Sequence, residues 1–165
     1  MNIEVIAVEA KHKSVLRQLM ELYNYDFSEY LQNEIDEHGY YNYSHLDDYW
    51  TDETRYPFFI KVNGNLAGFV LVYSLCEYIS NENAHSIAEF FVMKKCRNQN
   101  IGKFVAHYIF DLFNGEWEVT VLNVNKLAQQ FWNKVVNEYT KGKYIFHPNP
   151  TPNWNGVGYS FYTTV

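Results

Sequence analysis

The stretch Met93-Lys-Lys-Cys-Arg-Asn-Gln-Asn-Ile-Gly-Lys103 decides the interpretation of this chain. It holds Lys94, Lys95, Arg97 and Lys103 and no acidic residue, although the whole chain has a formal net charge of −6. At the start of a helix the backbone N–H groups are unpaired and the helix dipole favours an anion. A strand, a short basic loop and a helix start together can bind a phosphate group. A solvated basic turn explains the charges alone equally well.

The patterns on both sides of this stretch predict the elements that it connects. Residues 86–93 (SIAEFFVM) are rich in β-forming residues and predict a strand. Downstream, apolar residues recur at the spacing of a helix buried on one face, with Asn114-Gly115 as its stop. These residues are Ile101, Phe104, Val105, Tyr108, Ile109, Leu112 and Phe113.

The rest of the chain predicts further strands and helices. Apolar runs at 58–62 and 66–73 flank Asn63-Gly64-Asn65, which is typical of a hairpin. Strands are also expected at 3–8, 117–122, 139–146 and 159–165, and helical spacing recurs at 15–23 and 128–136. Between 24 and 55 we expect short helices and loops. This alternation predicts a mixed sheet with helices packed on it, in the α/β or α+β class.

Length and composition limit the possible functions. A chain of 165 residues without a linker or repeat predicts a single domain, 1–165. The acidic balance argues against a nucleic-acid partner. No signal peptide or membrane-length apolar run is evident, so we expect no membrane partner and a cytoplasmic location. The cysteines and histidines show no metal-binding spacing, so no metal is expected.

Residues 97–102 resemble a known motif. The GNAT superfamily of acyl-CoA N-acyltransferases carries R/Q-x-x-G-x-G/A between its fourth strand and third helix. Arg97 and Gly102 match this motif, and Asn100 stands where the first Gly is expected. Asn is among the few other residues that adopt positive φ at low cost. Residues 90–93 also resemble the family's preceding strand, and residues 125–132 (NKLAQQFW) resemble its N-x-x-A-x-x-F-Y helix.

The resemblance is clear from about residue 58 to 136, and it implies a fold and a co-substrate. The fold would have a mixed, mostly antiparallel sheet of about seven strands flanked by about four helices. The co-substrate would be acetyl-CoA, with its pyrophosphate on the loop amides and its pantetheine arm along the strand. The residues implied are Phe91, Val92, Met93, Arg97, Asn98, Gln99, Asn100, Ile101, Gly102, Lys103 and Asn125. Asn125 is equally suited to capping its helix.

The family reaction is direct transfer of the acyl group to an amine, which must first lose a proton. Glu89 is the candidate base, because it alternates with Ile87, Phe91 and Met93 on a face where a charge is unusual. A structural carboxylate is the alternative. The family often protonates the leaving thiolate with a Tyr; Trp132 stands there and cannot give up a proton. Its indole N–H can donate a hydrogen bond, or the ring can simply pack in the core.

The acceptor is expected to be a primary amine of a small molecule or peptide. The amino-terminal helices and the late hairpin usually build its pocket in this family, and a homodimer is common there. Candidate substrate-binding residues are Tyr25, Asp26, Glu29, Tyr49 and Trp50, with Tyr43, Asp47, Trp154 and Tyr159 as further possibilities. Aromatic rings with carboxylates suit an ammonium group, although most such rings belong to cores.

Two other functions remain open from the sequence. The chain can be a non-catalytic acyl-CoA-binding or sensor module, which the missing Tyr favours. It can also transfer a longer acyl group, depending on the space near Phe91.

Overall fold

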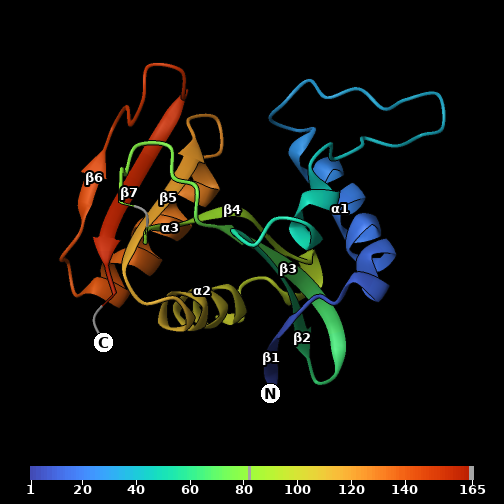
Figure 1. Cartoon of the computed structure of the whole chain (residues 1–165), viewed down its shortest axis with the longest axis horizontal. Helices are drawn as coiled ribbons and strands as arrows, with labels where there is room; N and C mark the ends of the chain where they lie inside the picture. The colour runs from blue at the N-terminus through green and yellow to red at the C-terminus, as the bar shows by residue number, and fades with distance from the viewer. Residues whose placement is uncertain (82, 164–165) are drawn as a thin grey trace.

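The computed structural model describes residues 1–81 and 83–163, which form one seven-stranded sheet with helices on both faces (Figure 1). The strands are β1 (Ile3–Ala7), β2 (Arg55–Val62), β3 (Asn65–Tyr73), β4 (His85–Val92), β5 (Glu116–Leu122), β6 (Ile145–His147) and β7 (Gly156–Tyr162). The α-helices are α1 (Lys13–Phe27), α2 (Ile101–Leu112) and α3 (Lys126–Thr140). Three short 3-10 helices occur at η1 (Ala10–His12), η2 (Leu46–Trp50) and η3 (Lys94–Cys96). The mixed, mostly antiparallel sheet is confirmed, with three α-helices where about four were expected.

The strand order is β1-β2-β3-β4-β5-β7-β6, and every neighbouring pair except β4–β5 is antiparallel. The predicted hairpin is confirmed: Val62 pairs with Asn65, and Asn63 and Gly64 both have positive φ. Asn and Gly are the residues that adopt this conformation at low cost, so the turn sets the β2–β3 register.

The predicted strand over 139–146 is wrong. The helix α3 continues to Thr140, because Trp132, Val135, Val136 and Tyr139 keep the spacing of one buried face. It ends at Lys141 and Gly142, both with positive φ. Only Ile145–His147 forms a strand. The predicted strand over 159–165 begins earlier, at Gly156, and ends at Tyr162; its last two residues lie outside the described part.

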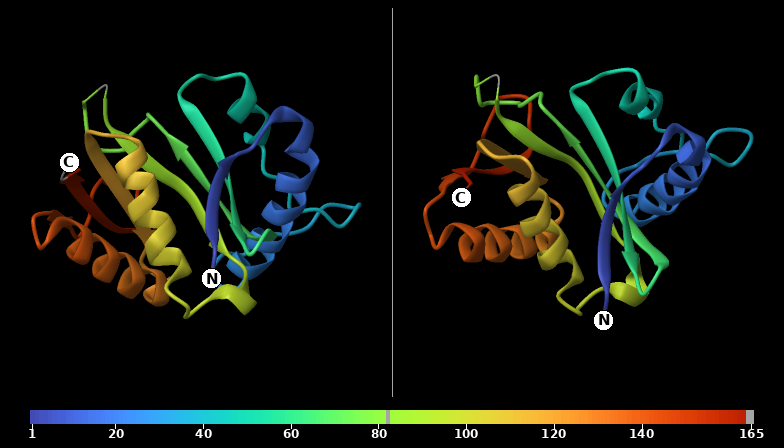
Figure 2. Two further views of the ribbon diagram at one scale, coloured as in Figure 1. Left: turned by 90° about the horizontal axis from the view of Figure 1, so that it is seen from below. Right: turned by 60° about the horizontal axis from the view of Figure 1, so that its bottom comes forward.

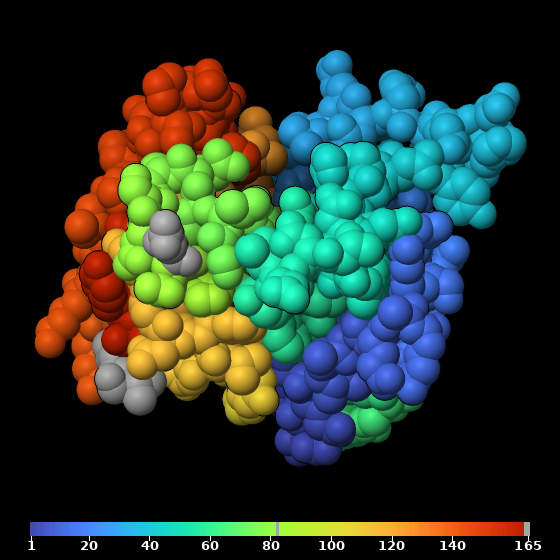
Figure 3. Space-filling model, in the orientation of Figure 1, coloured from blue at the N-terminus to red at the C-terminus, as the bar shows by residue number. Residues whose placement is uncertain are grey.

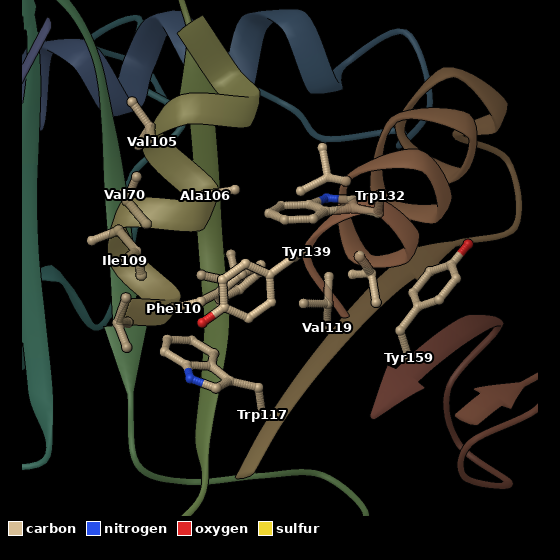
Figure 4. Close-up of a cluster of buried hydrophobic side chains, with 14 of the residues drawn as sticks. Val70, Val105, Ala106, Ile109, Phe110, Trp117, Val119, Trp132, Tyr139 and Tyr159 are labelled. Atoms are coloured by element: carbon tan, nitrogen blue, oxygen red, sulfur yellow. The ribbon is translucent and has the colours of Figure 1, made fainter. Parts of the chain in front are cut away.

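The sheet separates two cores, since α2 and α3 cover one face and α1 with η2 covers the other (Figure 2). The larger core gathers rings from α2, β5 and α3 (Figure 4). There Phe110 contacts Trp117 and Tyr139, with ring centroids 5.0 and 5.1 Å apart. Burying one such side chain contributes about 1.5–3 kcal/mol, so this core holds the second half of the sheet in place.

Strands β4 and β5 pair over only two positions, His85 with Trp117 and Ser86 with Glu118. Past Ser86 the rest of β4 pairs only with β3 among the described residues. The sheet therefore opens between β4 and β5, and the residues along this opening position the candidate site.

A β-bulge interrupts β4 at the same place. Leu71 of β3 pairs with Glu89, and the next residue, Val72, pairs with Ile87, so β4 contains one extra residue. As a result Ile87 packs in the core under α2 and α3, whereas Phe91 packs in the core under α1. The prediction that Glu89 and Ile87 share a face is therefore wrong, because simple alternation does not pass through a bulge.

Candidate active site at the opening between two strands

A cavity of about 430 Å³ lies where β4 and β5 separate. Its walls come from segments far apart in sequence. Lining residues are Tyr23, Asn24, Phe27, Leu31, Asn33, Tyr73, Glu77, Ser86–Phe90, Val119–Leu122, Asn125, Ala128, Trp132 and Trp154. Among the described residues no Lys, Arg or His lines it, and its carboxylates are Glu77 and Glu89.

Glu89 is partly buried in this cavity and accepts a hydrogen bond from the hydroxyl of Tyr23. Burial raises the pKa of the Glu89 carboxyl to about 7, although hydrogen bonds from Tyr23 and Tyr43 act in the opposite direction. A carboxyl group with this pKa can take up and release a proton near neutrality. The geometry therefore suits a general base.

Tyr23 reaches Glu89 because it belongs to the buried face of α1, with Leu16, Leu19 and Met20. Its ring packs on Phe27, with centroids 4.6 Å apart. Burial raises the pKa of Tyr23 well above its ordinary value, and the charge of Glu89 adds to this effect. Tyr23 is therefore a hydrogen-bond donor throughout the usual pH range. Sequence reasoning placed it in the helical pattern and missed its contact with Glu89.

The basic loop between β4 and α2 has the conformation of an anion-binding turn. Asn98 and Asn100 have φ of 60° and 61°, so Asn100 adopts the positive φ that its place in the motif requires. In the described part of the chain, the N–H groups of residues 98–103 have no hydrogen-bond partner. They lie at the start of α2, where the helix dipole adds positive potential.

Arg97 is held by the end of β4 and by α1. Its Nε donates to the Val92 carbonyl oxygen at 2.7 Å, and its Nη2 pairs with Asp26. Lys94 also pairs with Asp26, at 3.1 Å. Partial burial raises the pKa of Asp26, but hydrogen bonds from Arg97 and Lys94 outweigh this effect and lower it. Asp26 therefore braces the basic loop, and it does not line the cavity.

The other residues expected to hold acetyl-CoA lie around this loop. The side chains of Phe91 and Met93 pack in the core under α1, and Val92 packs in the opposite core. The Met93 N–H donates to the Ala67 carbonyl. Gln99 donates from its side chain to the Lys95 carbonyl at 2.9 Å, and Lys103 pairs with Glu138 at 3.0 Å. Ile101 is buried in the larger core.

Gly102 keeps the start of α2 close to α3. A Cβ atom at this position would lie 3.1 Å from the ring of Phe131, which is closer than ordinary contact. Phe131 contacts Phe90 and Trp132 in turn, with centroids 5.8 and 5.0 Å apart. The basic loop is thus joined to the cavity wall by direct packing.

Asn125 and Trp132 place α3 along the cavity. The Oδ1 of Asn125 accepts from the Ala128 N–H at 3.0 Å, so Asn125 caps α3, while the residue also lines the cavity. Trp132 is 6% exposed and its ring meets Phe90 edge to face at 5.0 Å. It lies on the cavity wall as a core residue.

The cavity does not include the five residues expected to bind the acceptor. Tyr25 is 66% exposed and Glu29 is exposed, whereas Tyr49 is buried in the core under α1. Trp50 donates its indole N–H to the Val8 carbonyl at 2.8 Å. Trp154 does line the cavity, and Tyr43 contacts Glu89. Sequence reasoning missed four residues that line the cavity, namely Asn24, Phe27, Tyr73 and Glu77. Their polar, aromatic or acidic side chains were the only sign in the sequence that they could belong to a site.

The remaining expected residues have structural partners. Asp47 pairs with Lys13 at 2.6 Å, and Tyr159 is buried and donates to the Gln129 carbonyl at 3.3 Å. Within residues 1–81 and 83–163 no group of three or more His, Cys, Asp or Glu side chains could hold a metal ion. None of the helices described here is both long and apolar enough to cross a membrane.

Known proteins share the family pattern and the fold of this chain. The acetyltransferase (GNAT) family model matches residues 16–136, which is more than half of the chain, so the chain belongs to this family. No curated protein matches it at a significant level.

Solved structures share the fold at low sequence identity. A GNAT-family acetyltransferase from Staphylococcus aureus Mu50 aligns with a TM-score of 0.65 and 16% identity, over 98% of this chain and 99% of its own. Aminoglycoside acetyltransferase AAC(6')-Ib, in complex with coenzyme A and kanamycin, aligns with a TM-score of 0.69 and 11% identity, over 98% of this chain and 95% of its own. The PaiA N-acetyltransferase of Thermoplasma acidophilum, in complex with coenzyme A, aligns with a TM-score of 0.66 and 11% identity, over 98% of this chain and 99% of its own.

Proposed function

We propose that this chain is an N-acetyltransferase that transfers the acetyl group of acetyl-CoA directly to a primary amine of a small molecule or peptide. The observation that carries the proposal is Glu89, a carboxyl group with a pKa of about 7 in the cavity at the β4–β5 opening. Family membership supports the reaction class. The remaining steps rest on the residues around the cavity.

The residues of the basic loop fit the phosphates of coenzyme A. Six consecutive N–H groups, from Asn98 to Lys103, are free to donate at the start of α2. Arg97 and Lys94 add positive charge, part of which Asp26 neutralises. The edge of β4 past Ser86, without a neighbouring strand among the described residues, is free to pair with the amides of the pantetheine arm. Acetyl-CoA would supply the acetyl group as a reactive thioester.

Glu89 then performs the proton transfer that the reaction needs. An acceptor ammonium has a pKa near ~10, so it arrives protonated. The ionised Glu89 carboxylate takes one proton from this nitrogen, whose lone pair forms the new C–N bond as the C–S bond breaks. The nitrogen then releases a second proton to solvent to give the neutral amide, and Glu89 passes its own proton to solvent. The departing sulfur leaves as a thiolate and takes a proton from solvent, because thiolates with pKa near ~8.5 leave without a strong acid. Trp132 forms part of the wall and supplies no proton.

The test is thiol release from acetyl-CoA with a panel of amines, comparing wild type with Glu89→Gln. Loss of a general base costs about 10²–10⁴-fold in rate, so kcat should fall by at least about 100-fold while the Kd for acetyl-CoA stays within twofold. Glu53→Gln is the matched control, because Glu53 is exposed outside the cavity. Unchanged kcat in Glu89→Gln would contradict the role of Glu89.

A non-catalytic acyl-CoA-binding module is the second candidate, and the core position of Trp132 in place of a Tyr favours it. This function requires acetyl-CoA to bind in a calorimeter while every amine in the panel is left unmodified. We also propose that residues 1–165 act as one domain.

A further inference from the structure

The cavity has an uneven charge that the transfer reaction alone does not explain. One carboxylate, Glu89, is enough to deprotonate the amine, yet Glu77 also lines the cavity. Among the described residues Glu77 has no ion pair and its carboxylate has no hydrogen-bond donor. Glu77 is exposed and shares the lack of an ion pair with other exposed acids such as Glu29 and Glu53, but unlike them it lines the cavity. Glu77 is thus an uncompensated charge beside the site.

The side chain of Glu77 is exposed, but its backbone is held in place. The N–H groups of Glu77 and Tyr78 donate to the carboxylate of Glu118 at 2.5 and 3.2 Å. Glu118 is fully buried on β5 and pairs with Ser86 at the β4–β5 junction. A buried carboxylate therefore anchors the loop after β3 at the point where the sheet opens. Figure 3 shows the surface of this part of the chain in light green. The Glu77 side chain starts from a defined position on the cavity wall.

Tyr73 lies close enough to both carboxylates of the cavity for their charges to affect its hydroxyl. It lines the cavity with both, and after burial the negative charges of Glu77 and then Glu89 raise the pKa of its hydroxyl. Arg55 lies over the Tyr73 ring at 5.5 Å, but it is committed to Asp52 and Asp48 and does not line the cavity. Both charges thus act on the Tyr73 hydroxyl, and no Lys, Arg or His of the described chain lines the cavity with them.

We propose that Glu77 is a specificity-determining residue and that the acceptor carries a second cationic group, which pairs with the Glu77 carboxylate while its primary amine faces Glu89. This inference rests on the proposed acetyl transfer. The aromatic rings of Phe27, Tyr73 and Trp154 suit the same ligand, since ring faces attract cations and cover the methylene groups between two amines. The acceptor class is then a diamine or a longer polyamine chain.

The experiment compares acceptors that differ only in the second charge. Initial rates with acetyl-CoA are measured for 1,4-diaminobutane, 1,5-diaminopentane and spermidine, each beside a monoamine of matched length that ends in a hydroxyl or methyl group. Wild type should have a kcat/KM at least about tenfold higher for the diamine, which is the size of one charge-assisted hydrogen bond. The preference should shrink as salt rises from about 0.05 to 0.5 M, because salt screens a partly exposed pair.

The variant Glu77→Gln keeps the size of the side chain and removes the charge. It should raise the KM for diamines about tenfold, leave kcat within twofold, and leave the monoamine rates unchanged. Glu53→Gln is the control, since it changes the net charge equally at an exposed position outside the cavity. Equal rates for diamine and monoamine in wild type, or an unchanged preference in Glu77→Gln, would overturn the inference while the acetyl transfer itself stands.

A binding measurement separates this inference from the proposed function. Titration of 1,4-diaminobutane into protein saturated with coenzyme A gives a Kd without any turnover. Binding that weakens about tenfold in Glu77→Gln supports the cation site even if no amine is acetylated. No diamine binding by wild type, together with efficient acetylation of monoamines, rejects the cation site and retains the reaction.

Discussion

At the scale of single residues, the chemistry of the site depends on the surroundings of Glu89. Its position on a β-bulge turns its side chain toward α1, where Tyr23 and Tyr43 donate to it. These hydrogen bonds lower the pKa of the carboxyl, but burial raises it by more, to about 7. The protonated form cannot act as a base, so we expect kcat to fall as the pH falls through about 7.

Replacing Tyr23 tests this balance. Tyr23→Phe removes a hydrogen bond that favours the ionised carboxylate, so the pKa of Glu89 should rise and the midpoint of the kcat–pH profile should move to higher pH by about 0.5–1 unit. At pH 7 the ionised fraction of Glu89 should fall from about one half to between about one quarter and one tenth, so the rate should drop about twofold to fivefold and recover at pH 9. Tyr108→Phe, on the exposed face of α2, is the control. A lower rate with an unmoved midpoint would show that Tyr23 acts only by packing.

At the scale of elements, the loop before α2 shows how backbone conformation sets a binding site. Asn100 has φ of 61° at the position preceding the helix, so a residue that resists positive φ should displace the N–H groups that follow. The sequence predicted this loop and the helix closely, because both depend on local rules. The predicted strand over 139–146 began too early, because α3 continues to Thr140 and only Ile145–His147 is a strand. The end of a helix depends on tertiary packing as well as on local pattern.

Two variants at Asn100 separate strain from chemistry. Asn100→Gly keeps the conformation without strain and should leave acetyl-CoA affinity within threefold. Asn100→Val places a β-branched residue at positive φ, at a cost of about 1–2 kcal/mol, and should weaken acetyl-CoA binding about tenfold. Calorimetric titration measures both. If the Gly variant binds as weakly as the Val variant, the Asn side chain itself contacts the ligand.

At the scale of the whole molecule, the site lies between two parts of one sheet that pair directly over only two positions. The sequence predicted the type of sheet, and its candidate base, Glu89, lines the cavity; it did not predict the opening or most of its walls. Helical spacing shows that Tyr23 and Phe27 point toward the sheet. It cannot show that the core under α1, to which they belong, borders a cavity. The walls from Tyr73, Glu77 and Trp154 come from strand ends and loops, whose positions depend on long-range contacts such as the burial of Glu118.

Bound acetyl-CoA should therefore stabilise the entire fold. A ligand that binds only the native state at 100 times its Kd contributes about 2.7 kcal/mol, which corresponds to a rise in Tm of about 5–10 °C for a chain of this size. Thermal unfolding measured with coenzyme A and with pantetheine shows how much of the rise in Tm comes from the phosphates and how much from the pantetheine arm. Pantetheine at the same concentration should give less than half of the shift, because it lacks the phosphates that the loop binds.

The anchoring of the loop after β3 by Glu118 has a consequence for evolution and engineering. The residues proposed to choose the acceptor lie on α1 and on surface segments near 73–77 and 154, whereas those proposed to hold acetyl-CoA lie on 97–103. Because these segments are separate in the chain, substitutions in the first group can change which amine is acetylated without weakening the binding of acetyl-CoA. A new acceptor preference should thus be obtainable from libraries confined to the first group.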